Sequence, residues 1–183
     1  GYIAVSLYNR FGSLTVSINR YASTLYSLTL SETRDFKEPS ATITAEEVPD
    51  ITNISGDDLP ADIDSIDGQH NGDNYFAYTF YLMNNGENTL SYEYRLDLTS
   101  VTRDVDRAIR IRLYVDGTPT TYARTRTDGT GAEPGTAEFR TQSTVMLATR
   151  ENFAPGEVTK FTVVIWIEGN DPDCVDDLIG GEL

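Results

Sequence analysis

The sequence is short of the residues on which most catalytic and metal centres depend. It contains one cysteine, Cys174, and one histidine, His70. A single cysteine cannot form a disulfide within the chain, and a single histidine cannot complete a zinc site of the His-x-x-x-His type. The acidic neighbours Asp173, Asp176 and Asp177 also disfavour the thiolate that a nucleophilic cysteine requires. We therefore expect neither a cysteine nucleophile nor a histidine-based metal centre.

Motifs for other reactions are missing as well. The sequence has no Gly-x-Ser-x-Gly motif and no glycine-rich phosphate loop. Aspartate and glutamate are numerous, so a carboxylate pair for glycoside hydrolysis is the one catalytic arrangement that the composition permits. The sequence predicts a protein that is not an enzyme.

Basic residues and long apolar runs are scarce. The chain has 14 lysine and arginine residues against 29 aspartate and glutamate residues, which gives a formal net charge of −15. Such a charge disfavours nucleic acid and anionic membrane surfaces as partners. No apolar run approaches the roughly 20 residues of a membrane span. The acidity suits a soluble extracellular protein or one that binds cations.

Apolar residues seldom recur at helical spacing, but they often alternate with polar ones. Two alternating runs lie between Tyr75 and Leu98, on either side of Asn84-Asn85-Gly86. Their apolar positions are Phe76, Tyr78, Phe80 and Leu82, then Tyr92, Tyr94, Leu96 and Leu98. The pattern predicts two half-buried strands at the centre of an all-β domain. The Asn-Asn-Gly segment predicts a turn with positive φ angles between them.

Further strands are predicted along the chain. Residues 107–115 alternate with Arg110 and Arg112 on the solvent side, Asp116-Gly117 predicts a hairpin turn, and residues 120–125 form the return strand. Strands are also expected at 14–18, 144–147 and 160–167. In the last of these, Val164 and Trp166 face one way, and the other face carries Phe161, Val163, Ile165 and Ile167.

The chain is expected to comprise an N-terminal strand segment at 1–20 and a single β-sandwich domain at 21–183 with an acidic excursion at about 39–73. Residues 21–37 fit either a strand or a short helix. About seven to nine short strands with short connections favour antiparallel pairing. The predicted fold class is all-β, an antiparallel β-sandwich or jelly roll with short helical or irregular excursions.

Oxygen-bearing side chains are concentrated around Gly68. Ca²⁺ takes about six to eight oxygen ligands, which a loop rich in Asp and Asn can supply in part. The candidate ligands are Asp62, Asp64, Asp67, Asn71 and Asp73. Their spacing departs from that of an EF-hand, and a solvated acidic loop is the alternative. A second candidate cluster comprises Asp171, Asp173, Asp176 and Asp177.

Four tyrosines could either contact a ligand or cover a face of the sheet. Tyr75, Tyr81, Tyr114 and Tyr122 are candidates for a sugar-binding platform. The alternative is that they cover the outer face of a sheet.

Three segments carry a resemblance to a known family. They are NYFAYTFYLMNNGENTLSYEY, AIRIRLYVDG and FAPGEVTKFTVVIWIEGNDPDC, from Asn74 towards the C-terminus. The patterns F-x-Y-x-F … N-x-G and PG-E-x-x-x-F-x-V-x-x-W resemble those of the TasA/camelysin group, exported β-sandwich proteins of Gram-positive bacteria that form surface and biofilm-matrix fibres. The first 70 residues match only in general layout. Camelysin is described as a metalloprotease, but a single histidine offers no recognisable zinc site, so the resemblance carries no enzymatic role here.

The resemblance implies a jelly-roll subunit that polymerises by donor-strand exchange, so that the N-terminal strand of one copy completes the sheet of the next. Residues 2–8 give an independent indication, because a terminal strand with two apolar faces must be buried on both, either in its own core or in that of a neighbouring molecule. The candidate donor-strand residues are Tyr2, Ile3, Val5, Leu7, Leu14, Val16 and Ile18.

The expected partners are therefore copies of the same chain in a head-to-tail homopolymer. The expected location is extracellular or at the cell surface after signal-peptide removal, since the chain starts without a methionine, as a cleaved mature form does. The alternative function is a monomeric secreted binding module or adhesin for glycans or host surfaces, with Ca²⁺ as the one cofactor considered.

Overall fold

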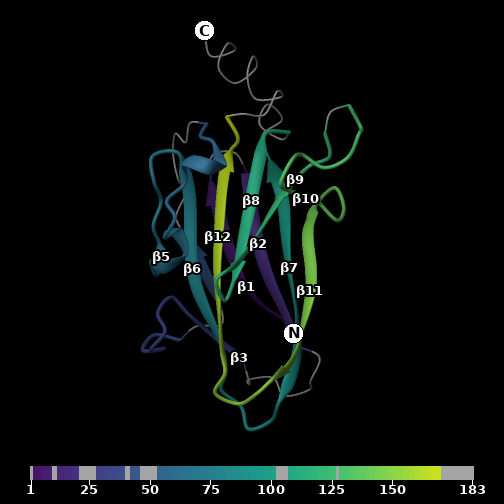
Figure 1. The fold of residues 1–183 in the computed structure, drawn as a ribbon. Helices are drawn as coiled ribbons and strands as arrows, with labels where there is room; N and C mark the ends of the chain where they lie inside the picture. Colours follow the sequence, from purple (N-terminus) through teal and green to yellow (C-terminus); the bar gives the residue numbers. More distant parts are fainter. Residues whose placement is uncertain are drawn as a thin grey trace.

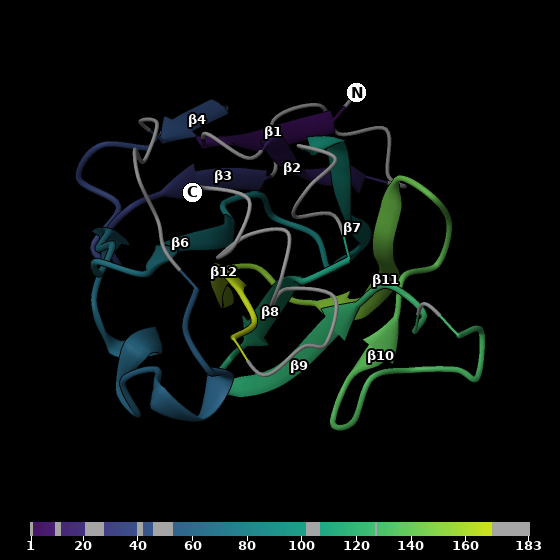
Figure 2. The same ribbon diagram turned by 90° about the horizontal axis from the view of Figure 1, so that it is seen from above.

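The fold is an all-β sandwich of two packed sheets (Figure 1). The computed structural model describes residues 2–9, 12–20, 28–39, 42–45, 53–101, 107–126 and 128–169. Seen from above, β1, β2 and β4 lie on one side of the sandwich and β6, β8, β9 and β12 on the other (Figure 2). The predicted fold class is confirmed.

The five-stranded sheet has the order β11-β7-β2-β1-β4. Its strands are β1 (Tyr2–Asn9), β2 (Gly12–Arg20), β4 (Thr42–Ala45), β7 (Leu90–Val101) and β11 (Thr144–Phe153). β11 is longer than the predicted strand at 144–147. Every pairing is antiparallel except that of β1 with β4.

The seven-stranded sheet has the order β10-β9-β8-β12-β6-β3, and β5 also pairs with β6. Its strands are β3 (Leu28–Ser31), β5 (Gly68–Gln69), β6 (Tyr75–Asn84), β8 (Ile109–Val115), β9 (Thr118–Ala123), β10 (Ala137–Glu138) and β12 (Val158–Ile167). Of the segment predicted as strand or helix, residues 28–31 form a strand, and 21–27 lie outside the described residues. β9 and β10 are parallel.

The two parallel pairs correct the expectation of a wholly antiparallel order. β4 follows β3, which belongs to the opposite sheet, so no hairpin fixes the direction in which β4 returns to β1. A long loop likewise separates β9 from β10. Antiparallel pairing is enforced only where a short connection joins neighbouring strands.

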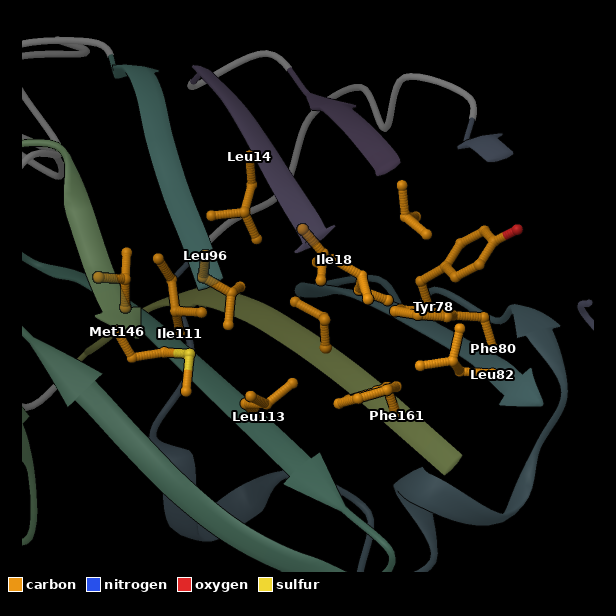
Figure 3. Close-up of a cluster of buried hydrophobic side chains, with 14 of the residues drawn as sticks. Leu14, Ile18, Tyr78, Phe80, Leu82, Leu96, Ile111, Leu113, Met146 and Phe161 are labelled. Carbon is orange, nitrogen blue, oxygen red and sulfur yellow. The ribbon is translucent and has the colours of Figure 1, made fainter. Parts of the chain in front are cut away.

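The core between the sheets is built from the alternating apolar positions. Figure 3 shows Leu14, Ile18 and Leu96 of one sheet facing Ile111, Leu113 and Phe161 of the other. From β6 the core receives the predicted set Phe76, Tyr78, Phe80 and Leu82, all at most 1% exposed. Burial of large side chains contributes about 1.5–3 kcal/mol each, so this layer is the main source of stability.

The connection between β6 and β7 departs from the sequence-based expectation. The two strands belong to different sheets, and none of Asn84, Asn85 and Gly86 has a positive φ angle. Asn84 is instead buried where the chain crosses between the sheets. Its Nδ2 donates to the carbonyls of Asn88 (2.9 Å) and Phe153 (2.8 Å), and its Oδ1 accepts from Gly86 N (2.9 Å).

The other predicted turns agree with the structure. Asp116 and Gly117 have φ angles of 49° and 87° and join β8 to β9. Two successive positive φ angles match the twist of a two-residue hairpin. Gly156, at the β11–β12 turn, has a φ angle of 83°.

Part of the acidic excursion covers the outer face of the seven-stranded sheet. It contains two 3-10 helices, η1 (Gly56–Asp58) and η2 (Ile63–Ser65), which lie on the side of this sheet away from the other sheet (Figure 2). Leu59 and Ile63 from the excursion pack with Ala77, Val164 and Trp166 in a second, smaller apolar cluster. Val164 and Trp166 lie on the opposite face of β12 from Phe161, as the alternation predicted, and the excursion buries them.

Among the residues that the structure describes, no helix is both long enough and apolar enough to cross a lipid bilayer.

Candidate functional site

The candidate donor-strand residues all lie in the hairpin of β1 and β2. Tyr2, Ile3, Val5 and Leu7 belong to β1, and Leu14, Val16 and Ile18 to β2. The register places Ile3, Val5 and Leu7 opposite Ile18, Val16 and Leu14. Val5, Leu14, Val16 and Ile18 are at most 1% exposed. Within one chain, β1 is therefore already paired in the chain's own sheet.

The two edges of β1 are covered unequally. All eight residues pair with β2, whereas only Ala4 to Leu7 pair with β4. The covering strand β4 has four residues. Beyond its ends, the described residues give β1 no second neighbour.

Two of the five predicted calcium ligands accept hydrogen bonds from other groups of the protein. Asp67 Oδ1 accepts a hydrogen bond from Tyr81 Oη at 2.6 Å, and Asn71 Oδ1 accepts one from Ala77 N at 3.0 Å. Asp62 begins η2, Asp64 lies within it, and Asp73 is exposed. In the part of the chain that the structure describes, no group of three or more His, Cys, Asp and Glu side chains could hold a metal ion. The cluster Asp171–Asp177 and Cys174 fall outside the described residues.

The single histidine contacts two separate parts of the excursion. His70 Nδ1 lies 2.8 Å from the carbonyl oxygen of Gly68, and Nε2 lies 2.6 Å from that of Ile63. Its backbone N donates to Ala77 O at 3.0 Å. A carbonyl oxygen can only accept a hydrogen bond. The two ring contacts are therefore both hydrogen bonds only when both ring nitrogens carry protons. The role of His70 is to hold η2 against the β5–β6 pair.

The four tyrosines considered for a sugar platform pack into the protein. Tyr75 and Tyr114 pack against the smaller apolar cluster, and Tyr122 packs against the main core. Tyr81 is 4% exposed. Burial, together with the hydrogen bond to the Asp67 carboxylate, raises the pKa of Tyr81 to about 12. Tyr75, Tyr81 and Tyr114 cover the outer face of the seven-stranded sheet, whereas Tyr122 packs into the core between the sheets.

A polar cleft of about 300 Å³ opens on the outer face of the seven-stranded sheet. Three parts of the chain line it: residues 55–57 of the excursion, the strands β8, β9 and β12 with the residue after β12, and residues 133–136. The lining residues are Ser55, Gly56, Asp57, Arg110, Arg112, Thr121, Glu133, Pro134, Thr136, Trp166 and Glu168. It contains two guanidinium groups and three carboxylates.

Trp166 and Glu168 fix the excursion to this face. Glu168 Oε1 accepts from Trp166 Nε1 at 3.0 Å and from Gly56 N at 2.8 Å. The backbones of Ile54 and residues 167–169 add hydrogen bonds of 2.9 and 3.0 Å. A Cβ atom on Gly56 would lie 3.0 Å from Trp166 Cζ2, so glycine permits this close approach.

Arg112 lies across Trp166. Its guanidinium carbon is 4.9 Å from the centre of the Trp166 ring, and its Nε donates to Thr121 Oγ1 at 2.7 Å. The stacking and the hydrogen bond fix the plane of the guanidinium group. The two terminal nitrogens remain as donors at the cleft.

Arg110 corrects one expectation from the sequence. The alternation placed it with Arg112 on the solvent side, but it is 4% exposed. Its Nη1 donates to the carbonyls of Arg107 (3.4 Å) and Ile109 (3.3 Å). The excursion and residues 133–136 cover this side of β8, which alternation alone does not reveal.

Glu133 holds the remaining side of the cleft. It is 8% exposed, and its Oε2 lies 3.7 Å from Arg126 Nε. Its carbonyl accepts from Thr136 N at 3.1 Å and from Thr136 Oγ1 at 2.8 Å. The sequence analysis missed this cleft because its parts come from segments far apart in the chain. The available signal was a tryptophan and two arginines on the outward positions of two strands.

In comparisons with known proteins, no family model, curated protein or solved structure matches this chain.

Proposed function

We propose that the protein is a structural subunit of an extracellular filament or surface fibre, polymerising by exchange of its N-terminal strand β1 between copies. The observation that carries the proposal is that β1 contributes to the core and is paired along its whole length only with β2. Val5 is fully buried, and only residues 10 and 11 connect β1 to β2.

Exchange preserves the interactions that β1 makes within one chain. If β1 leaves its own sheet, it can enter the equivalent place in a second copy. The eight residue pairs with β2 and the burial of Val5 are then recreated between molecules. Domain swapping of this kind costs little, because the strand makes the same interactions in the second copy as in its own chain.

The weak cover on the other side of β1 favours this exchange. β4 contributes four residue pairs, against eight from β2. When β1 leaves its own sheet, it therefore breaks only four residue pairs on that edge. Main-chain hydrogen bonds supply the affinity of such β-augmentation, and side chains at alternate positions set its register.

Serial exchange produces a fibre rather than a closed pair. Each copy gives its strand to one neighbour and receives a strand from another, and a head-to-tail contact that does not close by rotation extends indefinitely. The resemblance of the β6–β7 and β12 segments to the TasA/camelysin group supports the same function, and with it an extracellular location.

The test is a disulfide across the β1–β2 pair in assembled protein. Ser6 and Thr15 are directly opposite each other and partly exposed, so Ser6→Cys with Thr15→Cys places two thiols within reach. Cys174→Ser removes the native thiol. After assembly, oxidation and denaturing electrophoresis without reductant, strand exchange yields a ladder of covalent multimers.

A matched pair within one chain provides the control. Ser17→Cys with Arg95→Cys links β2 to β7, neither of which is exchanged, and should give only monomer bands. Negative-stain microscopy of the same samples should show filaments of uniform width. Filaments in which the Ser6/Thr15 variant gives only monomer would contradict strand exchange. Absence of filaments under every condition would contradict the fibre proposal itself.

A second function is supported by a different observation. The cleft beside Arg112 and Trp166 is the kind of feature expected of the alternative, a secreted binding module.

A further inference from the structure

The cleft has the chemistry of a binding site rather than of a packing defect. It is formed by polar and charged side chains from three segments, and its floor is fixed by the Glu168–Trp166 and Arg112–Thr121 hydrogen bonds. Preorganised side chains lose little conformational freedom when a ligand binds. The cleft lies on the outer face of the seven-stranded sheet, whereas β1 belongs to the other sheet. The site is therefore independent of the proposed strand exchange.

The lining presents donors and acceptors together. The terminal nitrogens of Arg112 can only donate, and the exposed carboxylate of Asp57 can only accept. Thr121, which accepts from Arg112 Nε, has a hydroxyl hydrogen to donate. A ligand that satisfies both kinds of group must itself donate and accept over a short distance.

Other ligand classes fit this lining poorly. The carboxylates of Asp57, Glu133 and Glu168 would repel a bound anion. The two guanidinium groups would repel a metal ion or an organic cation. Trp166 is 1% exposed, so it offers no open surface to an apolar ligand. The net charge of −15 opposes nucleic acid.

We propose that this cleft binds a neutral carbohydrate, one or two sugar units of a glycan, through neighbouring hydroxyl groups. A sugar hydroxyl donates and accepts at once, so adjacent hydroxyls can accept from Arg112 and donate to Asp57. Pro134 at the same cleft supplies a small apolar surface for the ring C–H groups. The volume of about 300 Å³ is at the lower end for ligand sites, in keeping with a short saccharide.

The test uses the intact protein on an array of neutral oligosaccharides built from glucose, galactose, mannose and N-acetylglucosamine. Sialylated and uronic acid glycans serve as charged comparators. The intact protein should bind at least one neutral glycan. Arg112→Gln and Asp57→Asn should each lower affinity about tenfold or more, because each removes a charged hydrogen-bonding partner.

Arg124→Gln is the matched control. Arg124 also lies over an aromatic ring, that of Phe139 at 4.9 Å, but it does not line the cleft. Its replacement should leave glycan affinity unchanged, and circular dichroism should show that all three variants fold. Asp57 is exposed, so Asp57→Asn tests the proposal even if Arg112→Gln unfolds.

Three results would overturn the proposal. One is an absence of binding to any neutral glycan. Another is binding only to the charged comparators. The third is binding that survives both cleft substitutions, since the glycan would then bind elsewhere.

Discussion

Asn84 shows how a single buried polar side chain determines the path of the chain between the two sheets. It is fully buried, and its side chain contacts Gly86, Asn88 and Phe153. Backbone hydrogen bonds from the same residue reach Gly156 and Glu157. The amide group therefore joins the β6–β7 connection to the β11–β12 turn. Apolar replacement would remove the donor to the Phe153 carbonyl in a buried hydrogen bond.

We expect Asn84→Ala to lower the free energy of unfolding by about 2–4 kcal/mol. The cost arises from the loss of both Nδ2 donors to Asn88 O and Phe153 O. Urea denaturation followed by tryptophan fluorescence measures it. Glu87→Ala, an exposed change in the same connection, should alter stability by less than about 0.5 kcal/mol. Equal effects from the two substitutions would show that Asn84 has no special role.

At the scale of elements, the β11–β12 turn depends on a carboxylate. Glu157 Oε1 accepts from Ala154 N at 3.0 Å, and Oε2 pairs with Arg150 Nη2 at 2.6 Å. The backbone hydrogen bond from Ala154, followed by the Arg150 guanidinium, lowers the pKa of Glu157 below its ordinary value of 4.5. The turn thus couples the two sheets through a group that titrates in acid.

The lowered pKa predicts an acid-sensitive contribution to stability. Because the folded state holds the Glu157 proton less tightly than the unfolded chain, the contribution is present above the unfolded value of about 4.5 and is lost as pH falls through the folded pKa. As pH is lowered from about 6 to about 3, the urea concentration at the unfolding midpoint should therefore decrease less in Glu157→Gln than in the parent protein. Glu151→Gln, an exposed change on β11, should keep the parent's slope.

For the whole molecule, buried tyrosines set the alkaline limit of stability. Burial raises the pKa of Tyr92 to about 12, and burial with the Asp67 hydrogen bond does the same for Tyr81. Burial also raises the pKa of Tyr78, Tyr94 and Tyr122 above the ordinary 10.0. The folded protein therefore retains protons that the unfolded chain releases.

The free energy of unfolding should consequently fall as pH rises above about 10. Above this pH the unfolded chain releases tyrosine protons that the folded protein still holds, so rising pH favours the unfolded chain. The decline should continue through about pH 12 and coincide with the rise in tyrosinate absorbance. Tyr81→Phe should flatten this dependence, because it removes one of the shifted groups but keeps a ring beneath Arg34. Tyrosines that ionise well before the β-sheet signal is lost would contradict the prediction.

Alternation and turn dipeptides in the sequence predict most of the buried apolar positions and the course of the main strands. Alternation predicted Phe76, Tyr78, Phe80 and Leu82 on one face of β6, and Trp166 on the opposite face of β12 from Phe161. The Asp116-Gly117 dipeptide predicted the hairpin turn. These features are local, because a period of two fixes the face of a strand and two adjacent residues fix a tight turn. The all-β class followed from the same signals.

Which strands become neighbours depends on the packing of the whole chain. This packing separated β6 and β7 into different sheets, paired β1 with β4 in parallel and buried Arg110 beneath distant segments. It also gave Asp67 and Asn71 structural partners and brought Asp57, Arg112 and Trp166 to one cleft. Such outcomes depend on contacts between residues far apart in the chain. Alternation specifies the buried face of each strand, but many strand orders bury the same faces equally well, and the packing of the whole chain selects one.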